Sequence, residues 1–146
     1  MKFYTGSDHA GFKTKEALKK HLEKKKIEVF DVGAFNEEKT DYPDFGQKVA
    51  LRVAEEKGSF GLLVCGTGIG MSITANKIKG IRAANPFDEY TAKVAHEHND
   101  ANIICLGGRT YTPARAKKIL DAFLKAKGAS EQRHLRRVDK IIALEK

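Results

Sequence analysis

The chain has few cysteines and no long uninterrupted apolar run. Its 146 residues include two cysteines, Cys65 and Cys105, which do not form the disulfide framework of a small secreted protein. The uncharged span at residues 58–76 is broken by five glycines and five hydroxyl or amide side chains, so it does not predict a membrane helix. The N-terminus shows no apolar targeting stretch. We expect a protein of the reducing cytoplasm without a membrane segment.

Charge is unevenly distributed along the chain. The net charge is +8, and seven lysines crowd residues 13–26. This excess suits an anionic partner, but a nucleic-acid surface would be better supported by interleaved aromatics, and only Phe12 accompanies these lysines. We interpret the lysines as a solvated helix face and expect no nucleic-acid partner.

Five short apolar segments alternate with helical patterns. Strands are predicted at residues 2–6, 27–31, 60–64, 81–84 and 102–106, and after Gly128 an amphipathic pattern predicts an extra C-terminal helix. The length suits one domain, residues 1–146, that buries roughly two thirds of its unfolded surface. The alternation predicts a three-layer α/β/α doubly wound, Rossmann-like sandwich with a five-stranded parallel sheet.

The most informative segment follows the third predicted strand. There Cys65 begins a turn with glycines at alternate positions, Gly66, Gly68 and Gly70, and a helical pattern follows at residues 71–77. Such glycines let the backbone approach a ligand, and the amides and dipole at a helix N-terminus favour an anion. The segment therefore predicts an anion site that contains a thiol. The same environment favours the thiolate, so Cys65 is a candidate base or nucleophile.

Familiar nucleotide and phosphate motifs fit this loop poorly. A dinucleotide fingerprint would need glycine near Met71, a cysteine phosphatase would need arginine at Met71, and no Walker lysine follows. A structural role for Cys65 stays open, because free cysteines are often core residues. Cys105 lies inside the fifth predicted strand, and we assign it to the core.

Polar residues also follow other predicted strands. Asp8 and His9 come after the first strand, and Arg109 comes after the fifth. Because ligands bind at the carboxyl ends of parallel strands, we expect an acid, imidazoles, a thiol, an anion cradle and arginines at one edge of the sheet. Arg133 and Arg137, four apart on the last helix, could form a phosphate fork, although such pairs are more often only solvated.

Two other features leave alternatives open. His96 and His98 stand near acidic residues, but side chains two apart on a helix diverge by about 200 degrees, so we expect no metal site. We interpret this helix end as presenting His98 and Asn99 near the next strand. Tyr42, in a polar connection, could line a site or anchor its loop.

The motifs together resemble ribose-5-phosphate isomerase type B, in the wider group with galactose-6-phosphate isomerase. The resemblance spans nearly the whole chain in order. The matching segments are Ser-Asp-His-Ala-Gly-Phe (7–12), Thr-Asp-Tyr-Pro (40–43), Cys-Gly-Thr-Gly-Ile-Gly-Met-Ser-Ile (65–73), Ala-Asn-Lys (75–77), Gly-Ile-Arg-Ala (80–83), His-Asn-Asp (98–100) and Arg-His-x-x-Arg (133–137).

The resemblance implies an aldose–ketose isomerase of the pentose phosphate pathway that needs no metal or redox cofactor. It implies that Cys65 moves the proton between C1 and C2, that His98 helps to open the sugar ring, and that Thr67 and the loop amides hold the enediolate. Asp8 and Asn99 would bind hydroxyls. The substrate-binding residues it implies are Asp8, His9, Tyr42, Gly66, Gly68, Ile69, Gly70, Asn99, Arg109, Arg133 and Arg137, of which His9 and the three arginines would hold the phosphate.

The resemblance also implies a homodimer or a dimer of dimers, with each active site completed by a neighbouring subunit. One departure concerns the substrate. Asn85-Pro86-Phe87 replaces the more apolar or cysteine-bearing strand exit expected in the family. An isomerase of a six-carbon sugar phosphate, such as allose or galactose 6-phosphate, is therefore kept as an alternative. A second alternative is a non-catalytic sensor that binds sugar phosphate or nucleotide through the same glycine loop.

Overall fold

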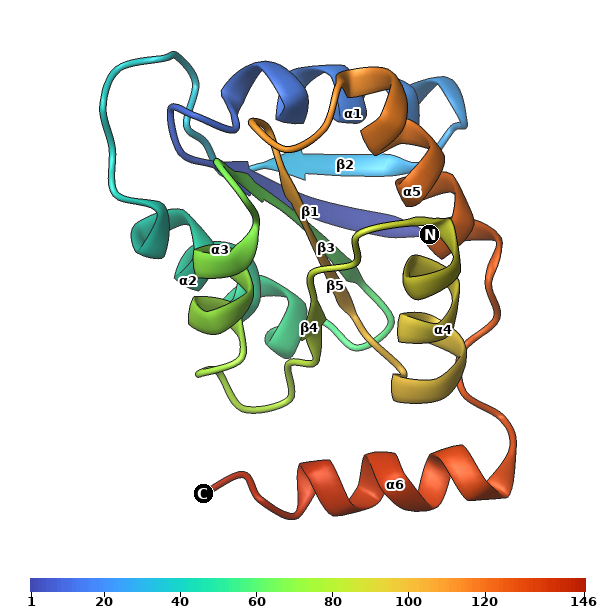
Figure 1. The fold of residues 1–146 in the computed structure, drawn as a ribbon. Helices are drawn as coiled ribbons and strands as arrows, with labels where there is room; N and C mark the ends of the chain where they lie inside the picture. Colours follow the sequence, from blue (N-terminus) through green and yellow to red (C-terminus); the bar gives the residue numbers. More distant parts are fainter.

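Six helices surround a wholly parallel, five-stranded sheet in the computed structural model, which describes residues 1–146 (Figure 1). The strand order is β2-β1-β3-β5-β4, which confirms the predicted doubly wound fold. The strands are β1 (Lys2–Ser7), β2 (Glu28–Asp31), β3 (Phe60–Cys65), β4 (Ala83–Ala84) and β5 (Ile103–Gly107). The helices are α1 (Phe12–Lys24), α2 (Tyr42–Glu55), α3 (Ile69–Ala75), α4 (Glu89–Asn99), α5 (Pro113–Lys125) and α6 (Gln132–Ile142).

The central strand β3 contributes to both halves of the core. Leu62 and Val64 pack with residues of α1, α4 and α5 on one face, whereas Leu63 and Cys65 pack with residues of α2 and α3 on the other. Successive side chains of a strand point to opposite faces, so an unbroken apolar strand buries both. Figure 1 shows the two helical layers that cover these faces. The sheet thus carries Cys65 at the end of a fully buried strand.

Helix α3 and strand β4 each begin two residues away from the predicted position. Helix α3 begins at Ile69 rather than Met71, because Gly68 adopts the left-handed conformation (φ 81°) that turns the chain directly into the helix. Strand β4 keeps two of the four predicted residues. The two lost residues are Ile81 and Arg82, and Arg82 N donates to the Asn102 side chain (2.9 Å) instead of to a strand backbone. At its other end the strand cannot continue, because Pro86 has no N–H group.

Helix α4 returns the chain to the edge of the sheet where the strands begin. Its last residues precede β5, and Asp100 forms an ion pair (2.9 Å) with Arg82, just ahead of β4. Helix α6 lies across this same end of the molecule (Figure 1), and the His134 ring stacks on His98 with a centroid distance of 4.0 Å. Beyond α6, Glu145 accepts a hydrogen bond from Gly80 N (2.9 Å).

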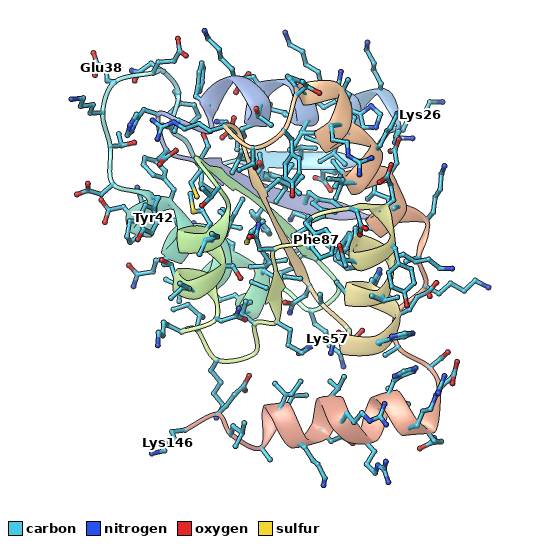
Figure 2. All side chains as sticks on the ribbon, in the orientation of Figure 1. Lys26, Glu38, Tyr42, Lys57, Phe87 and Lys146 are labelled. Atoms are coloured by element: carbon cyan, nitrogen blue, oxygen red, sulfur yellow. The ribbon has the colours of Figure 1, made fainter.

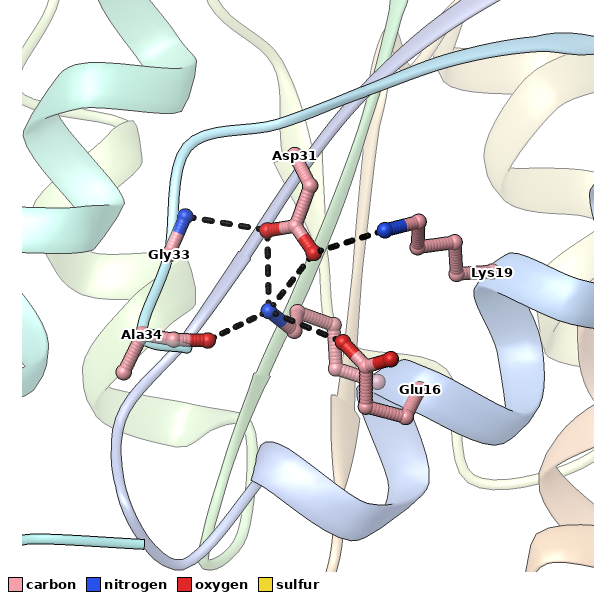
Figure 3. A network of polar contacts seen from close by, with 6 residues as sticks. Glu16, Lys19, Asp31, Gly33 and Ala34 are labelled. Carbon is pink, nitrogen blue, oxygen red and sulfur yellow. Dashed lines mark hydrogen bonds and ion pairs between the residues drawn. The ribbon is translucent and has the colours of Figure 1, made fainter. Parts of the chain in front are cut away.

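A buried ion pair ties α1 to the end of β2 (Figure 3). Lys15 is fully buried, and its Nζ donates to both carboxylate oxygens of Asp31 (2.8 and 2.9 Å) and to the Ala34 carbonyl (2.6 Å). Burial disfavours the Asp31 carboxylate, but hydrogen bonds from Lys15 and Gly33 outweigh burial and hold the Asp31 pKa below its usual range. The network fixes the start of the connection that leads to α2.

None of the six helices combines the length and apolar character needed to cross a membrane.

Candidate active site

Cys65 lies where β3 passes into the glycine loop, residues 65–70. Its side chain is buried, and its Sγ accepts a hydrogen bond from Gly68 N (3.1 Å). The loop after β5 braces this turn, because Gly108 N donates to Cys65 O (2.8 Å) and Arg109 N donates to Gly66 O (2.9 Å). An N–H group directed at sulfur favours the charged form of a thiol. The Cys65 sulfur is therefore held inside the glycine loop, which is itself fixed by hydrogen bonds from the loop after β5.

Tyr42 and Arg109 flank the glycine loop. A Cβ atom added at Gly70 would lie 2.5 Å from ring carbons of Tyr42, so the ring of this residue lies against the first turn of α3. Figure 2 shows Tyr42 at the start of α2, beside α3. The Arg109 side chain lies beside Gly66, with Nη1 3.4 Å from the position of a Cβ there. Ile69 and Thr67 are exposed at the same turn. Aromatic, cationic and backbone N–H groups therefore surround one small region.

Asp8 and His9 lie at the neighbouring tip of β1. Asp8 is buried, and its Oδ1 accepts from Gly11 N (2.9 Å) at the start of α1. The His9 Nδ1 lies 3.2 Å from both the N and the O atom of Thr40, so the connection before α2 fixes this ring. His9 and Thr40 line a surface cavity of about 630 Å³ together with Lys39, Asp41, Asp44, Phe45, Gln47 and Lys48. The strand tips thus carry an acid, one imidazole, a thiol and one arginine.

A second group of predicted site residues lies at the opposite edge of the sheet. His98 and Asn99 end α4, and Arg133 and Arg137 lie on α6 (Figure 1). The expectation that all imidazoles and arginines meet at the strand tips is therefore wrong within one chain. A helix between parallel strands must return to the edge from which the next strand starts, so its last turn lies far from the strand tips.

This second group has its own geometry. The His98 and His134 rings are nearly parallel, with an interplanar angle of 8°. Burial and the nearby charges of His98 and Arg133 lower the pKa of His134, and its buried Nε2 has no hydrogen-bond partner. Arg133 Nε donates to Glu131 Oε2 (2.8 Å). His98 and Glu131 also line a cavity of about 830 Å³. Sequence reasoning missed His134, whose only signal was its place inside the Arg-His-x-x-Arg segment.

Cys105 and Asn85 complete the surroundings of the glycine loop. Burial and the neighbouring Cys65 raise the pKa of the Cys105 thiol far above its usual range, so Cys105 remains a protonated core residue. Asn85 Nδ2 donates to Cys105 O (2.8 Å) and to Thr67 O (3.3 Å). Sequence reasoning noted Asn85 only as a departure in the strand exit and gave it no role. The structure brings together no three His, Cys, Asp or Glu side chains that could hold a metal ion.

The arrangement at the strand tips suits the transfer of one proton beside a developing oxyanion. The thiolate form of a cysteine can remove a proton from carbon, and backbone amides in a glycine turn can stabilise the negative oxygen that results. The cationic Arg109 side chain next to Gly66 favours an anionic ligand at the same place.

Comparison with known proteins gives a consistent result. The family described as Ribose/Galactose Isomerase matches residues 3–141. Ribose-5-phosphate isomerase B of Escherichia coli is 43% identical over 140 residues, covering 96% of this chain and 93% of that protein.

Solved structures agree with the sequence comparison. The structure of Clostridium thermocellum ribose-5-phosphate isomerase B superimposes with a TM-score of 0.96 at 46% identity, covering 99% of this chain and 97% of that one. The Mycoplasma genitalium ribose-5-phosphate isomerase B, solved with bound ribulose-5-phosphate, gives a TM-score of 0.94 at 41% identity and covers 99% of this chain and 95% of that one. The resemblance found in the sequence motifs is thereby confirmed, and the chain belongs to the ribose/galactose isomerase family.

Proposed function

We propose that this chain interconverts ribose 5-phosphate and ribulose 5-phosphate, with Cys65 as the base. The observation that carries the proposal is the position of the Cys65 sulfur, which ends a buried strand and accepts the Gly68 N–H at the entry of the glycine loop. The family supports the reaction type, because the compared relatives are named ribose-5-phosphate isomerase B and one was solved with bound ribulose-5-phosphate.

The proposed reaction moves a proton from C2 to C1 of the open-chain sugar. The Cys65 thiolate takes the C2 proton of ribose 5-phosphate, and the carbonyl oxygen on C1 becomes the negative oxygen of an enediolate. Amides of residues 66–70, apart from the Gly68 N–H that donates to Cys65 Sγ, hold the enediolate oxygens together with the Thr67 hydroxyl. Thr67 Oγ1 accepts from Ile69 N (3.2 Å) and keeps its own proton to donate. Cys65 then returns its proton to C1, while O1 takes up the proton that O2 loses, and this gives ribulose 5-phosphate. Asp8 binds a sugar hydroxyl.

We also propose that two copies of the chain build each active site. Cys65, Asp8, His9 and Arg109 lie at one edge of the sheet, whereas the proposed ring-opening acid His98 and its neighbours lie at the other edge. A single small sugar phosphate cannot reach both edges of one sheet. His98 and Asn99 of a second copy would complete the site, and the phosphate would be held by His9, Arg109, Arg133 and Arg137 from the two copies. A homodimer or a dimer of dimers satisfies this requirement.

Apolar side chains on α6 support such an assembly. Ile141 and Ile142 remain 43% and 41% exposed although they lie on the helix that crosses the end of the sheet. Ile69 and Ile73 on α3 are also exposed, beside the glycine loop. Exposed apolar groups next to functional residues are common at subunit interfaces.

The cytoplasmic location, the independence from metal and redox cofactors and the absence of a nucleic-acid partner stay predictions.

Turnover of different sugar phosphates tests the proposed function. Ribose 5-phosphate should be isomerised with a higher kcat/KM than allose 6-phosphate or galactose 6-phosphate. The reverse order would favour the six-carbon alternative, which the exposed Phe87 at the exit of β4 keeps open (Figure 2). Saturable binding of ribose 5-phosphate by folded protein, without formation of ribulose 5-phosphate, would instead identify a sensor.

Complementation between inactive variants tests the shared site. Cys65→Ala and His98→Ala homodimers should each be inactive. If each site takes Cys65 from one copy and His98 from the other, a heterodimer of the two variants holds one intact site. Half of the dimers in an equal, re-equilibrated mixture are heterodimers, so about a quarter of the wild-type activity should return. No recovery in a mixture that demonstrably exchanges subunits would contradict the shared site.

A further inference from the structure

Asn85 follows β4 at the point where Pro86 ends the strand. The Asn85 side chain donates a hydrogen bond to β5, whereas the backbone of Pro86 cannot donate one because proline has no N–H group. Nδ2 lies 2.8 Å from the Cys105 carbonyl of β5 and 3.3 Å from the Thr67 carbonyl of the glycine loop. Both neighbours are acceptors, so the side chain must direct its NH₂ group, and not its oxygen, toward them. Asn85 therefore joins the edge of the sheet to the glycine loop through two donated hydrogen bonds.

The second of these bonds acts on the peptide group that contacts the Cys65 sulfur. The Thr67 carbonyl and the Gly68 N–H belong to the same planar peptide unit and cannot rotate separately. The carbonyl of this unit accepts from Asn85, and its N–H donates to Cys65 Sγ (3.1 Å). A hydrogen bond to a carbonyl also polarises the N–H on the other side of the amide and makes it a stronger donor.

The space around Gly68 shows how closely the Asn85 amide approaches the loop. Gly68 has φ 81°, and a Cβ atom added to it would collide with Asn85 Nδ2 and would lie 3.0 Å from the Leu106 carbonyl carbon. The peptide that carries the Gly68 N–H is thus held between the Asn85 amide and the backbone of β5. Rotation of this peptide away from the sulfur would break the Asn85 bond.

We propose that Asn85 is a positioning residue for the isomerisation. Through the Thr67–Gly68 peptide it aims and strengthens the N–H that stabilises the Cys65 thiolate, the form that removes the sugar proton. The proposal rests on the proposed role of Cys65 as base. Asn85 acts through the loop backbone, so it should affect proton transfer rather than binding of the phosphate, whose proposed ligands are other residues.

Other charged and titratable groups near the thiol stay the same when Asn85 is changed. Cys105 on β5 is the neighbouring thiol. Asp8 follows β1, and its backbone N–H donates to the Val64 carbonyl (3.3 Å), next to Cys65. Tyr42 at the start of α2 and Arg109 after β5 flank the glycine loop. A change in the pH behaviour of Cys65 in Asn85→Ala, which adds no charge, therefore reports on the Asn85 hydrogen bonds.

Two substitutions of Asn85 and a matched control test the proposal. Asn85→Ala removes both donors without adding a charge and carries the main comparison. Asn85→Asp keeps the shape of the side chain but replaces the donors with acceptor oxygens and adds a negative charge, so its effect should be larger than that of Asn85→Ala. Asn76→Ala is the control, because Asn76 Nδ2 also donates to two carbonyls, Ser72 O (3.0 Å) and Ala83 O (2.8 Å), and links α3 to β4 without contacting Thr67 or Gly68. If Asn85→Asp does not fold, Asn85→Ala and Asn85→Ser carry the same comparison.

Two measurements are made on each folded variant. The first is the pH dependence of kcat and KM for ribose 5-phosphate. The second is the pH dependence of Cys65 alkylation by iodoacetamide, followed on the Cys65 peptide by mass spectrometry. Loss of the Asn85 donor weakens the hold on the peptide whose N–H reaches Cys65 Sγ, so both midpoints should rise in Asn85→Ala. At neutral pH kcat should fall about tenfold, and KM should stay within about twofold.

The outcomes separate this proposal from the proposed function. Asn76→Ala should keep the wild-type midpoints even if it unfolds at a lower temperature. Unchanged midpoints in folded Asn85 variants would overturn the positioning role, whatever happens to kcat. A Cys65→Ala variant that keeps wild-type turnover would overturn Cys65 as the base, whereas the alkylation midpoint would still show whether Asn85 acts on the thiol.

Discussion

The buried ion pair between Lys15 and Asp31 predicts a large and pH-dependent loss of stability in Lys15→Met. Methionine retains most of the packing of the lysine stem but leaves Asp31, whose side chain is 7% exposed, without its main partner. Removing one member of a buried pair typically costs 3–5 kcal/mol. Lys19 still lies 3.3 Å from the carboxylate and is itself partly exposed, so the lower figure, about 3 kcal/mol, applies. For a chain of this length we expect the melting temperature to fall by roughly 6–12 °C.

The pH dependence of this loss follows from the lowered pKa of Asp31. A carboxylate with a lowered folded-state pKa stabilises the fold above its unfolded-state pKa, and this contribution disappears as the pH falls through the folded-state value. The difference between the wild-type protein and Lys15→Met should therefore be full at pH 7 and should shrink as the pH falls below about 4. Urea unfolding, followed by circular dichroism at several pH values, measures this difference.

A double variant shows whether the uncompensated charge is the cause. Lys15→Met combined with Asp31→Asn removes both charges, and an amide oxygen can still accept from Gly33 N. The double variant should recover about 1.5 kcal/mol of the roughly 3 kcal/mol lost by Lys15→Met alone. Equal losses in the single and double variants, or a loss that does not change between pH 7 and pH 3, would refute the reasoning.

Three other predictions concern the active site. Cys65→Ala should lose several orders of magnitude in kcat with little change in folding. In this variant, exchange of the C2 label of deuterated ribose 5-phosphate with solvent should disappear, while ligand binding persists. Near-wild-type turnover would make a carboxylate such as Asp8 the next candidate base. Arg137→Ala should raise KM about ten- to a hundredfold, because a charged hydrogen bond to phosphate is lost; an unchanged KM would exclude a phosphate role. The active protein should sediment as a dimer or tetramer, and an active monomer would contradict the shared site.

Local sequence patterns determined the fold class and the place of the thiol. Apolar segments alternating with helical patterns predicted all five strands, and a helix after each strand requires a parallel sheet. Cys65 was placed at the end of a strand and the start of a glycine loop, as the structure shows. These features depend on residues close in sequence, so periodicity and glycine spacing are sufficient to predict them.

Only the tertiary structure decided which functional residues share one edge of the sheet. Local patterns placed His98 on a helix, but whether its last turn meets Cys65 depends on the direction of α4 relative to β5. Two hydrogen-bonded contacts, from Lys15 to Asp31 and from Asn85 to Thr67, likewise join segments that the strand order β2-β1-β3-β5-β4 brings together. Periodicity carries no information about such contacts, because they depend on the packing of distant segments and not on the conformation of any one of them.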